Sequence, residues 1–266
     1  MTTLAAVALD CLLECDVARK RARTAEVAAE WRAGRLELVG DDLPAVRDLP
    51  VPGRPERPVL VPPRQLASRG LGSVEGRIAL LHAVAHIEFN AVNLAWDAVY
   101  RFRGLPRAYY DDWVSVADDE ARHFGLLAAR LGEHGAAYGD LPAHNGLWEM
   151  AVRTAADPLA RMALVPRVLE ARGLDVTPGM IARLREAGDP ASADVLAVIL
   201  AEEVAHVAAG TRWFTHLCAE RGLAPGATFL ALVRQHAAGA VRPPFNHPAR
   251  AQAGFDAAEM AALQAL

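Results

Sequence analysis

The 266-residue sequence contains few cysteines, and they form no recognisable framework. Cys11, Cys15 and Cys218 include no C-x-x-C pair and no disulfide pattern, which is typical of a reducing compartment. The first residues lack the basic start and apolar core of a signal peptide, and no apolar run reaches the length that we expect of a membrane span. We therefore expect a cytoplasmic protein without membrane attachment.

Strand patterns are also scarce, because few stretches alternate β-branched or aromatic residues with polar ones. Ala, Leu and Arg dominate instead, and these residues favour helix. Hydrophobic residues make up 53% of the chain and charged residues 23%, so the chain can bury a sizeable core. The composition predicts an all-α protein.

The charge balance does not favour nucleic-acid binding. The net charge is -4 and the pI is about 6.1, which disfavours direct contact with a polyanion but leaves a modified RNA substrate open. The longest basic cluster, ARKRAR at 18–23, is expected to be a solvated helix face, with a contact site as the alternative. Phosphate-binding glycine loops are absent, so any electrons for redox chemistry would come from an external donor.

Three segments are expected along the chain: residues 1–72, 73–222 and 223–266. The first combines a helix at 3–33 with an extended strap at 40–63, where proline excludes both helix and central strand. The seven strap prolines are Pro44, Pro50, Pro52, Pro55, Pro58, Pro62 and Pro63. The middle segment is expected to be a four-helix bundle with helices at 74–103, 107–131, 147–172 and 191–221, plus a short helix at 178–187. The third carries helices at 225–237 and after 256.

Two E-x-x-H pairs carry the chemical signal: Glu120 with His123, and Glu203 with His206. Residues three apart share one helix face, so both side chains of a pair can reach one metal ion. At about 100° per residue, each glutamate lies in the middle of an apolar stripe. A carboxylate that faces a core must be protonated, paired or bound to a metal.

The other two bundle helices each offer one inward glutamate. Glu88 has an apolar helical face, whereas the face of Glu170 is mixed and Pro166 predicts a kink there. Glu88 precedes Glu120 by 32 residues, and Glu170 precedes Glu203 by 33. Four glutamates and two histidines in this order form the ligand set of a di-iron or di-manganese carboxylate site. The alternative is a metal-free bundle with buried ion pairs.

Five stretches resemble the ferritin-like superfamily and, within it, the uncharacterised family called domain of unknown function 455. They are LGSVEGRIALLHAVAHIEFNAVNLAWDA, YYDDWVSVADDEARHFGLL, GLWEMAVRTAADPLARMALVPRVLEARGLDVTPGM, EEVAHVAAGTRWF and RPPFNHPARAQAGF. Together they cover most of residues 70–255. The resemblance implies a ferritin-like bundle with a dinuclear metal site, and says less about the substrate.

Two shorter likenesses concern individual positions. DEARH at 119–123 is similar to the D-E-x-R-H of bacterial di-iron oxygenases, which implies that Asp119 and Arg122 orient the metal ligands. The second copy has Glu202 in place of that Asp and lacks the Arg, so a symmetric arrangement is not implied. LEAR at 169–172 resembles the third-helix glutamate of tRNA-modifying di-iron hydroxylases, which supports Glu170.

The favoured function is an oxygen-dependent oxidoreductase or hydroxylase. It would hold two iron ions, with manganese as an alternative and zinc disfavoured, and act on a small molecule or a modified nucleoside. A metal-binding or ferroxidase-type protein without organic substrate is the second hypothesis, and a structural bundle with an empty or single-zinc site is the third. His82 and His86 point away from Glu88 and are expected to be hydrogen-bonded structural residues, with support of the metal ligands or contact with a substrate as the alternative. The sequence does not indicate the oligomeric state.

Overall fold

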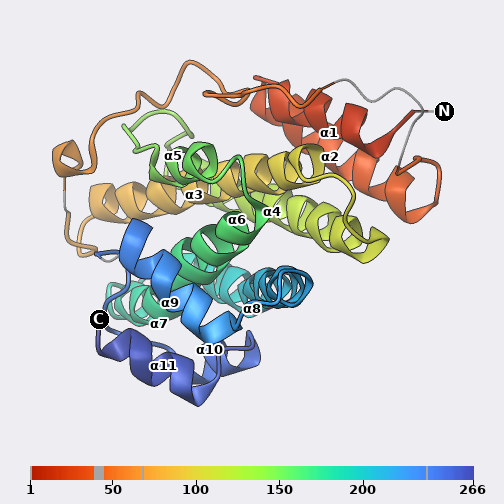
Figure 1. Ribbon diagram of the computed structural model, residues 1–266. Helices are drawn as coiled ribbons and strands as arrows, with labels where there is room; N and C mark the ends of the chain where they lie inside the picture. The colour runs from red at the N-terminus through yellow and green to blue at the C-terminus, as the bar shows by residue number, and fades with distance from the viewer. Residues whose placement is uncertain (1, 39–44, 68, 238) are drawn as a thin grey trace. The chain divides into compact units, whose positions relative to one another are not determined.

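The computed structural model describes residues 2–38, 45–67, 69–237 and 239–266 (Figure 1). Within these ranges helices are the dominant secondary structure, and the only β pairings are the isolated bridges Thr3–Glu37 and Leu60–Ala143. The all-α prediction is therefore confirmed. The chain divides into two compact units, Met1–Val152 and Arg153–Leu266, and each is described by itself. The division falls inside the predicted segment 73–222, and the three predicted segments stay a prediction.

The first unit begins with two helices, α1 (Leu4–Leu13) and α2 (Val17–Arg32). The prediction of one helix over 3–33 was wrong because polar side chains between them bind the backbone in place of a helix turn. The Asp16 carboxylate accepts a hydrogen bond from the Arg19 amide and caps α2, while Glu14 accepts from the Asp16 amide at 2.7 Å. Asp at this position is a strong helix start signal.

Lys20, the only lysine in the sequence, is 1% exposed. Its ammonium group donates to the Cys11 and Leu12 carbonyl oxygens at the end of α1, and to Asn93 Oδ1 at 2.6 Å. Burial lowers the pKa of Lys20 to about 8. The expectation of a fully solvated basic cluster at 18–23 was wrong at this position, because the end of α1 leaves carbonyl groups that need a donor.

The helices α3 (Val74–Arg101) and α4 (Arg107–Glu133) pack side by side and form the core of the first unit, with α1 against α3 and α2 against α4 (Figure 1). Ser73 caps α3 by accepting from the Gly76 amide at 3.1 Å. By length and mean hydropathy alone, α3 qualifies as a membrane span, which the sequence expectation missed. Of that apolar window, 67% is buried inside the protein, so packing accounts for its composition.

The proline-rich segment is extended over residues 45–62, as predicted, whereas Pro63 begins a helical turn; Pro44 lies outside the described residues. Its only helical turn is the short η1 (Pro63–Gln65). The Val61 amide donates to the Ala143 carbonyl, and the Ala143 amide to the Val59 carbonyl. Trp148, on α5 (Gly146–Arg153), donates to the Pro50 carbonyl at 3.1 Å. The strap is thus tied to the first unit along its length.

The second unit consists of α6 (Pro158–Leu164), a π-helical segment η2 (Val165–Glu170), α7 (Ala171–Glu186), α8 (Pro190–Glu220), α9 (Pro225–His236), α10 (His247–Gln252) and α11 (Ala257–Gln264). The predicted helix 147–172 is interrupted, because Asp157 caps a new helix whose first residue is Pro158. The predicted stop at Gly173 was also wrong: α7 runs through it and absorbs the short helix predicted at 178–187.

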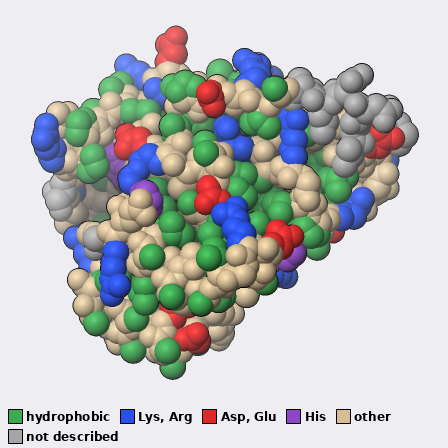
Figure 2. Space-filling model, viewed as in Figure 1, with side chains coloured by type: hydrophobic (Ala, Val, Ile, Leu, Met, Phe, Trp, Pro, Cys, Tyr) green, Lys and Arg blue, Asp and Glu red, His purple; other side chains and the backbone are tan. Residues whose placement is uncertain are grey.

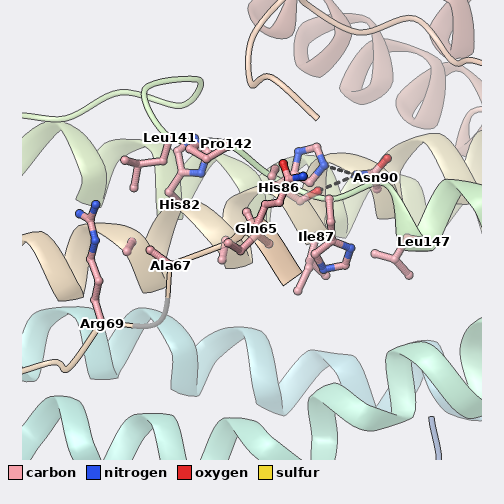
Figure 3. A pocket seen from close by; sticks show the side chains of 15 residues that line it. Gln65, Ala67, Arg69, His82, His86, Ile87, Asn90, Leu141, Pro142 and Leu147 are labelled. Atoms are coloured by element: carbon pink, nitrogen blue, oxygen red, sulfur yellow. Dashed lines mark hydrogen bonds between the residues drawn. The ribbon is translucent and has the colours of Figure 1, made fainter. Parts of the chain in front are cut away.

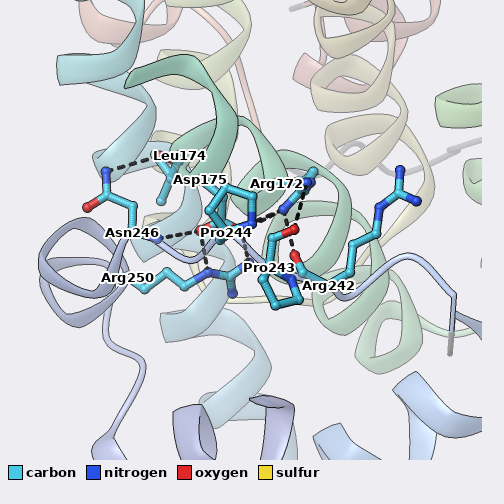
Figure 4. A network of polar contacts seen from close by, with 8 residues as sticks. All are labelled: Arg172, Leu174, Asp175, Arg242, Pro243, Pro244, Asn246 and Arg250. Atoms are coloured by element: carbon cyan, nitrogen blue, oxygen red, sulfur yellow. Dashed lines mark hydrogen bonds and ion pairs between the residues drawn. The ribbon is translucent and has the colours of Figure 1, made fainter. Parts of the chain in front are cut away.

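The structure shows a helix, α10, within the segment 242–255, which was expected to be loop-like at first. The residues before and within α10 contact α7 (Figure 4). Arg250 forms a buried two-pronged pair with Asp175, at 2.9 and 2.7 Å. Asn246 donates its amide proton to Asp175 and its side-chain NH₂ to the Leu174 carbonyl at 3.0 Å. Pro178, four residues after Leu174, has no amide proton to fill that place in the helix ladder. The Asn246 side chain therefore replaces the hydrogen bond that proline removes.

Charged side chains of both signs are interspersed among apolar and neutral ones on the face seen in Figure 2. Lys20 is buried, so arginine supplies the positive side-chain charge of the described surface.

Candidate metal centre

Three predicted ligands meet inside the first unit. Glu88 comes from α3, and Glu120 and His123 come from successive turns of α4. His123 Nδ1 lies 3.3 Å from Glu88 Oε2 and 3.5 Å from Glu120 Oε2. Ligand atoms of the three residues all lie within 4.8 Å of one another. The structure thus brings together the whole predicted ligand group of this unit.

These three side chains are buried: Glu88 is 4% exposed, Glu120 1% and His123 0%. Two carboxylates at such a depth are costly as bare anions, and a metal ion offsets that cost. Ligand atoms about 2.0–2.2 Å from one ion stand roughly 3–3.5 Å apart, which is the spacing seen around His123 Nδ1. Two carboxylates and one imidazole at these distances form a group that can hold a metal ion.

The face of α4 that carries Glu120 is apolar, as the helical projection predicts. Its neighbours Trp113, Val116, Ala117 and Leu127 are all at most 4% exposed. Phe124 also lies on this face and meets Phe89 of α3 edge-on, with ring centroids 5.9 Å apart. The carboxylates are thus enclosed by packed side chains that keep bulk water away from a bound ion.

The second unit repeats the pair on α8. His206 Nδ1 lies 3.3 Å from Glu203 Oε1, close to the 3.5 Å between His123 and Glu120. His206 has 2% and Glu203 13% of its side chain exposed. The same nitrogen faces the same kind of oxygen in both pairs, so each pair can present one carboxylate and one imidazole to a single ion.

Glu170 is the last residue of the π-helical segment and is 9% exposed. A π-helical segment does not follow the 100° step of an α-helix, so the helical projection around Glu170 was unreliable, as the kink predicted at Pro166 implies. The segment packs against α8, the helix that carries Glu203 and His206. Isolated π turns within α-helices are frequent at functional sites.

The residues predicted to orient the metal ligands lie on α4 and α8 and are partly exposed. Asp119 and Arg122 form an ion pair at 2.9 Å, with 35% and 45% of their side chains exposed. Glu202 is partly exposed on α8. Their roles in holding the metal ligands stay predictions.

The comparisons with known proteins give one family. The family model described as "Protein of unknown function (DUF455)" matches residues 13–261. The chain belongs to the DUF455 family. A relative, named an uncharacterized protein of Haemophilus influenzae, is 44% identical to this DUF455 chain over 213 residues, which cover 77% of the chain and 74% of the relative. No solved structure matches the chain significantly.

The π segment of this DUF455 chain is held by a buried cation that the sequence did not reveal. Arg167 is 2% exposed, and its Nη2 donates to both carboxylate oxygens of Glu259 on α11 at 2.7 Å. Its guanidinium carbon lies 4.0–4.8 Å from three ring centroids, those of Phe214, Phe229 and Phe255. This cation–π enclosure fixes the segment three residues before Glu170. A single charged residue in an apolar run, paired 92 positions later, gives no local signal.

In the first unit of the DUF455 chain, an arginine binds the backbone of α4 next to Glu120. Arg21 of α2 donates from Nε to the Ala121 carbonyl at 3.0 Å. A Cβ on Gly125 would come within 2.0 Å of the Arg21 guanidinium, so glycine makes room for this arginine on α4. Part of the basic cluster at 18–23 thus supports the helix that carries two metal ligands.

Proposed function

We propose that the chain is a ferritin-like protein with a dinuclear metal centre. Glu88, Glu120 and His123 would hold one ion, and the remaining predicted ligands, Glu170, Glu203 and His206, would hold the second. The observation that carries the proposal is the buried group in the first unit, whose ligand atoms lie within 4.8 Å of one another.

The repetition of the pattern supports a second ion. The α8 pair has nearly the same nitrogen-to-oxygen distance as the α4 pair, and each Glu-x-x-His follows a further buried glutamate by 32 or 33 residues. Four-helix proteins with dinuclear carboxylate centres use this ligand set, with one glutamate from each of two helices and a Glu-x-x-His from each of the other two.

The favoured activity is oxidation or hydroxylation of a small organic substrate with dioxygen. Two iron ions would supply the redox chemistry when bound, and manganese is the alternative that the same oxygen and nitrogen ligands accept. The chain itself would fix ligand geometry through its helices and exclude water with the apolar faces around Glu88 and Glu120. An external donor would supply electrons, because the sequence contains no nucleotide-binding loop.

The test begins with the metal content of full-length protein purified from its native host. Two iron or manganese ions per chain are expected, and Glu120→Gln and Glu203→Gln should each lower the content. The matched control is Glu133→Gln, because Glu133 is also on α4 but has 63% of its side chain exposed. If Glu203→Gln leaves the metal content at the wild-type value, the assignment of Glu203 as a metal ligand is wrong.

Oxygen uptake separates the enzyme from a metal-storage protein. Consumption that depends on an added organic substrate and a reductant supports the oxidoreductase. Iron oxidation without any organic product overturns it in favour of a ferroxidase. A wild-type chain that binds no metal, while Glu120→Gln folds as well as wild type, overturns both.

A further inference from the structure

The first unit contains a pocket of about 190 Å³ that the metal proposal does not use (Figure 3). It lies on α3 beside the strap and the loop that leads to α5. On the helix, His82 and His86 are about 120° and 160° away from Glu88 at 100° per residue, so the pocket and the carboxylates are on different faces. Its polar or charged lining residues are Gln65, Arg69, His82, His86, Asn90 and His144.

Two histidines offer hydrogen-bond donors there. His82 is 1% exposed, and its Nε2 accepts a hydrogen bond from the Gly139 amide at 2.9 Å. His144 Nδ1 accepts from the Gly146 amide at 3.2 Å. A ring nitrogen that accepts carries no proton, so in the neutral ring the proton is on the other nitrogen. His82 Nδ1 and His144 Nε2 are therefore donors, and within the described residues neither is hydrogen-bonded to the protein.

Two more of the polar lining residues, His86 and Asn90, are hydrogen-bonded to each other. The Asn90 side-chain NH₂ donates to His86 Nε2 and to the His86 carbonyl oxygen, both at 3.0 Å. His86 Nδ1 is then the donor to the Tyr138 hydroxyl at 2.8 Å, and Tyr138 stacks on both His82 and His86. This network fixes the floor of the pocket and leaves the donors of His82 and His144 for a ligand.

The charged side chain that lines the pocket is a cation, Arg69. Arg69 is exposed at the pocket, and no aspartate or glutamate is among the residues that line it. A concave site with a cation and no carboxylate attracts anions. The remaining lining is apolar and includes Leu66, Ile87, Leu141 and Leu147, so the body of the ligand is apolar. A cavity of about 150 Å³ holds benzene, and this pocket is slightly larger.

From these contacts we propose that the pocket binds a small organic carboxylate whose apolar body is about the size of one aromatic ring. Its carboxylate would accept hydrogen bonds from the imidazole N–H groups, and the charge of Arg69 would draw it in. Inorganic phosphate fits less well, because most of the lining offers it no donor. The site is a second ligand site, and its existence does not depend on the proposed metal chemistry.

Benzoate and its neutral analogue benzamide are the probes, titrated into full-length protein and followed by calorimetry or ligand-observed NMR. Benzoate is expected to bind at least about tenfold more tightly, since hydrogen bonds to an ionised group are roughly twice as strong as neutral ones. Arg69→Gln should weaken benzoate several-fold and leave benzamide unchanged. Arg64→Gln is the matched control, because Arg64 is exposed on the same segment and does not line the pocket.

Ala79→Leu tests the position of the site, because Ala79 lines the pocket on α3 and the larger side chain fills it. It should abolish benzoate binding while the helical circular dichroism stays that of wild type. Equal affinities for benzoate and benzamide, tighter binding of inorganic phosphate, or full binding by a folded Ala79→Leu protein would each overturn the proposal. Glu120→Gln should lose metal but keep benzoate, so failure of one proposal is distinguishable from failure of the other.

Discussion

Gly210 on α8 provides a sharp test of the packing that holds Glu170 in place. A Cβ at this position would lie 2.3 Å from both Cβ and Cγ of Pro166, on the π segment. Ordinary van der Waals contact between carbon atoms begins near 3.5 Å, so Gly210→Ala forces α8 and the segment apart by about 1 Å. Both elements belong to the second unit, and the proline ring cannot rotate out of the way.

The expected loss of stability is the difference between two terms. Alanine is better than glycine within a helix by about 1 kcal/mol. Overpacking of a close contact costs about 1–3 kcal/mol, and a collision with a proline ring belongs at the upper end of that range. Gly210→Ala should therefore lower the free energy of unfolding by about 1–2 kcal/mol and the thermal midpoint by roughly 2–8 °C.

Urea denaturation measures the change, and Gly173→Ala is its control. Gly173 is inside α7 of the same unit, and a Cβ there meets nothing within 4 Å. The control should gain up to about 1 kcal/mol from helix propensity. If Gly210→Ala is stabilised as much as Gly173→Ala, the close approach of Pro166 to α8 is refuted.

Three further outcomes are expected. Glu259→Gln leaves the Arg167 cation buried beside a neutral amide, so it should cost about 3–5 kcal/mol in urea denaturation, whereas Arg167→Met combined with Glu259→Leu should cost clearly less. Lys20 has its pKa lowered to about 8, so the unfolded chain keeps more protons on this amine near and above that pH, and stability should rise by roughly 0.5–1 kcal/mol from pH 8 to 9. Cys11, with its pKa raised to about 12, offsets part of this rise, because over the same pH range its thiol ionises only in the unfolded chain. Lys20→Met should abolish the rise. Removal of bound metal by a chelator should lower the thermal midpoint of the wild-type chain by several degrees, and a Glu120→Gln chain that shows the same drop would contradict the assignment of that ligand.

The sequence predicted the long regular helices well because their signals are local. Ser73 and Pro106 mark the starts of α3 and α4, and the apolar stripe around Glu120 is regular enough for a helical projection. The structure brings Glu88, Glu120 and His123 close together, and their role as metal ligands stays a prediction. Glu203 and His206 follow the same logic on α8.

Elsewhere the decisive contacts are distant in sequence. Helix α7 continues past Gly173 and tolerates Pro178 because Asn246, 72 residues after Leu174, satisfies the carbonyl that proline leaves open. The break at residues 14–16 depends on short polar side chains whose helix propensity is only moderately poor. Pro166 alone indicates an irregular helix at this position. The direction of the π segment is set by Arg167 and the three phenylalanine rings around its guanidinium group. No local pattern contains that information.

Lys20 gives the first unit a chemical reporter of its own opening. Because it is the only lysine of the sequence and is 1% exposed, an amine-reactive ester can acylate its side chain only when α1 and α2 separate from Asn93. The acylation rate of one peptide, read by mass spectrometry, therefore gives the free energy of that local opening. The same labelling can be run on the chain with and without metal. Slower acylation with metal would show that the ion stabilises the Lys20–Asn93 contact, to which no proposed metal ligand belongs.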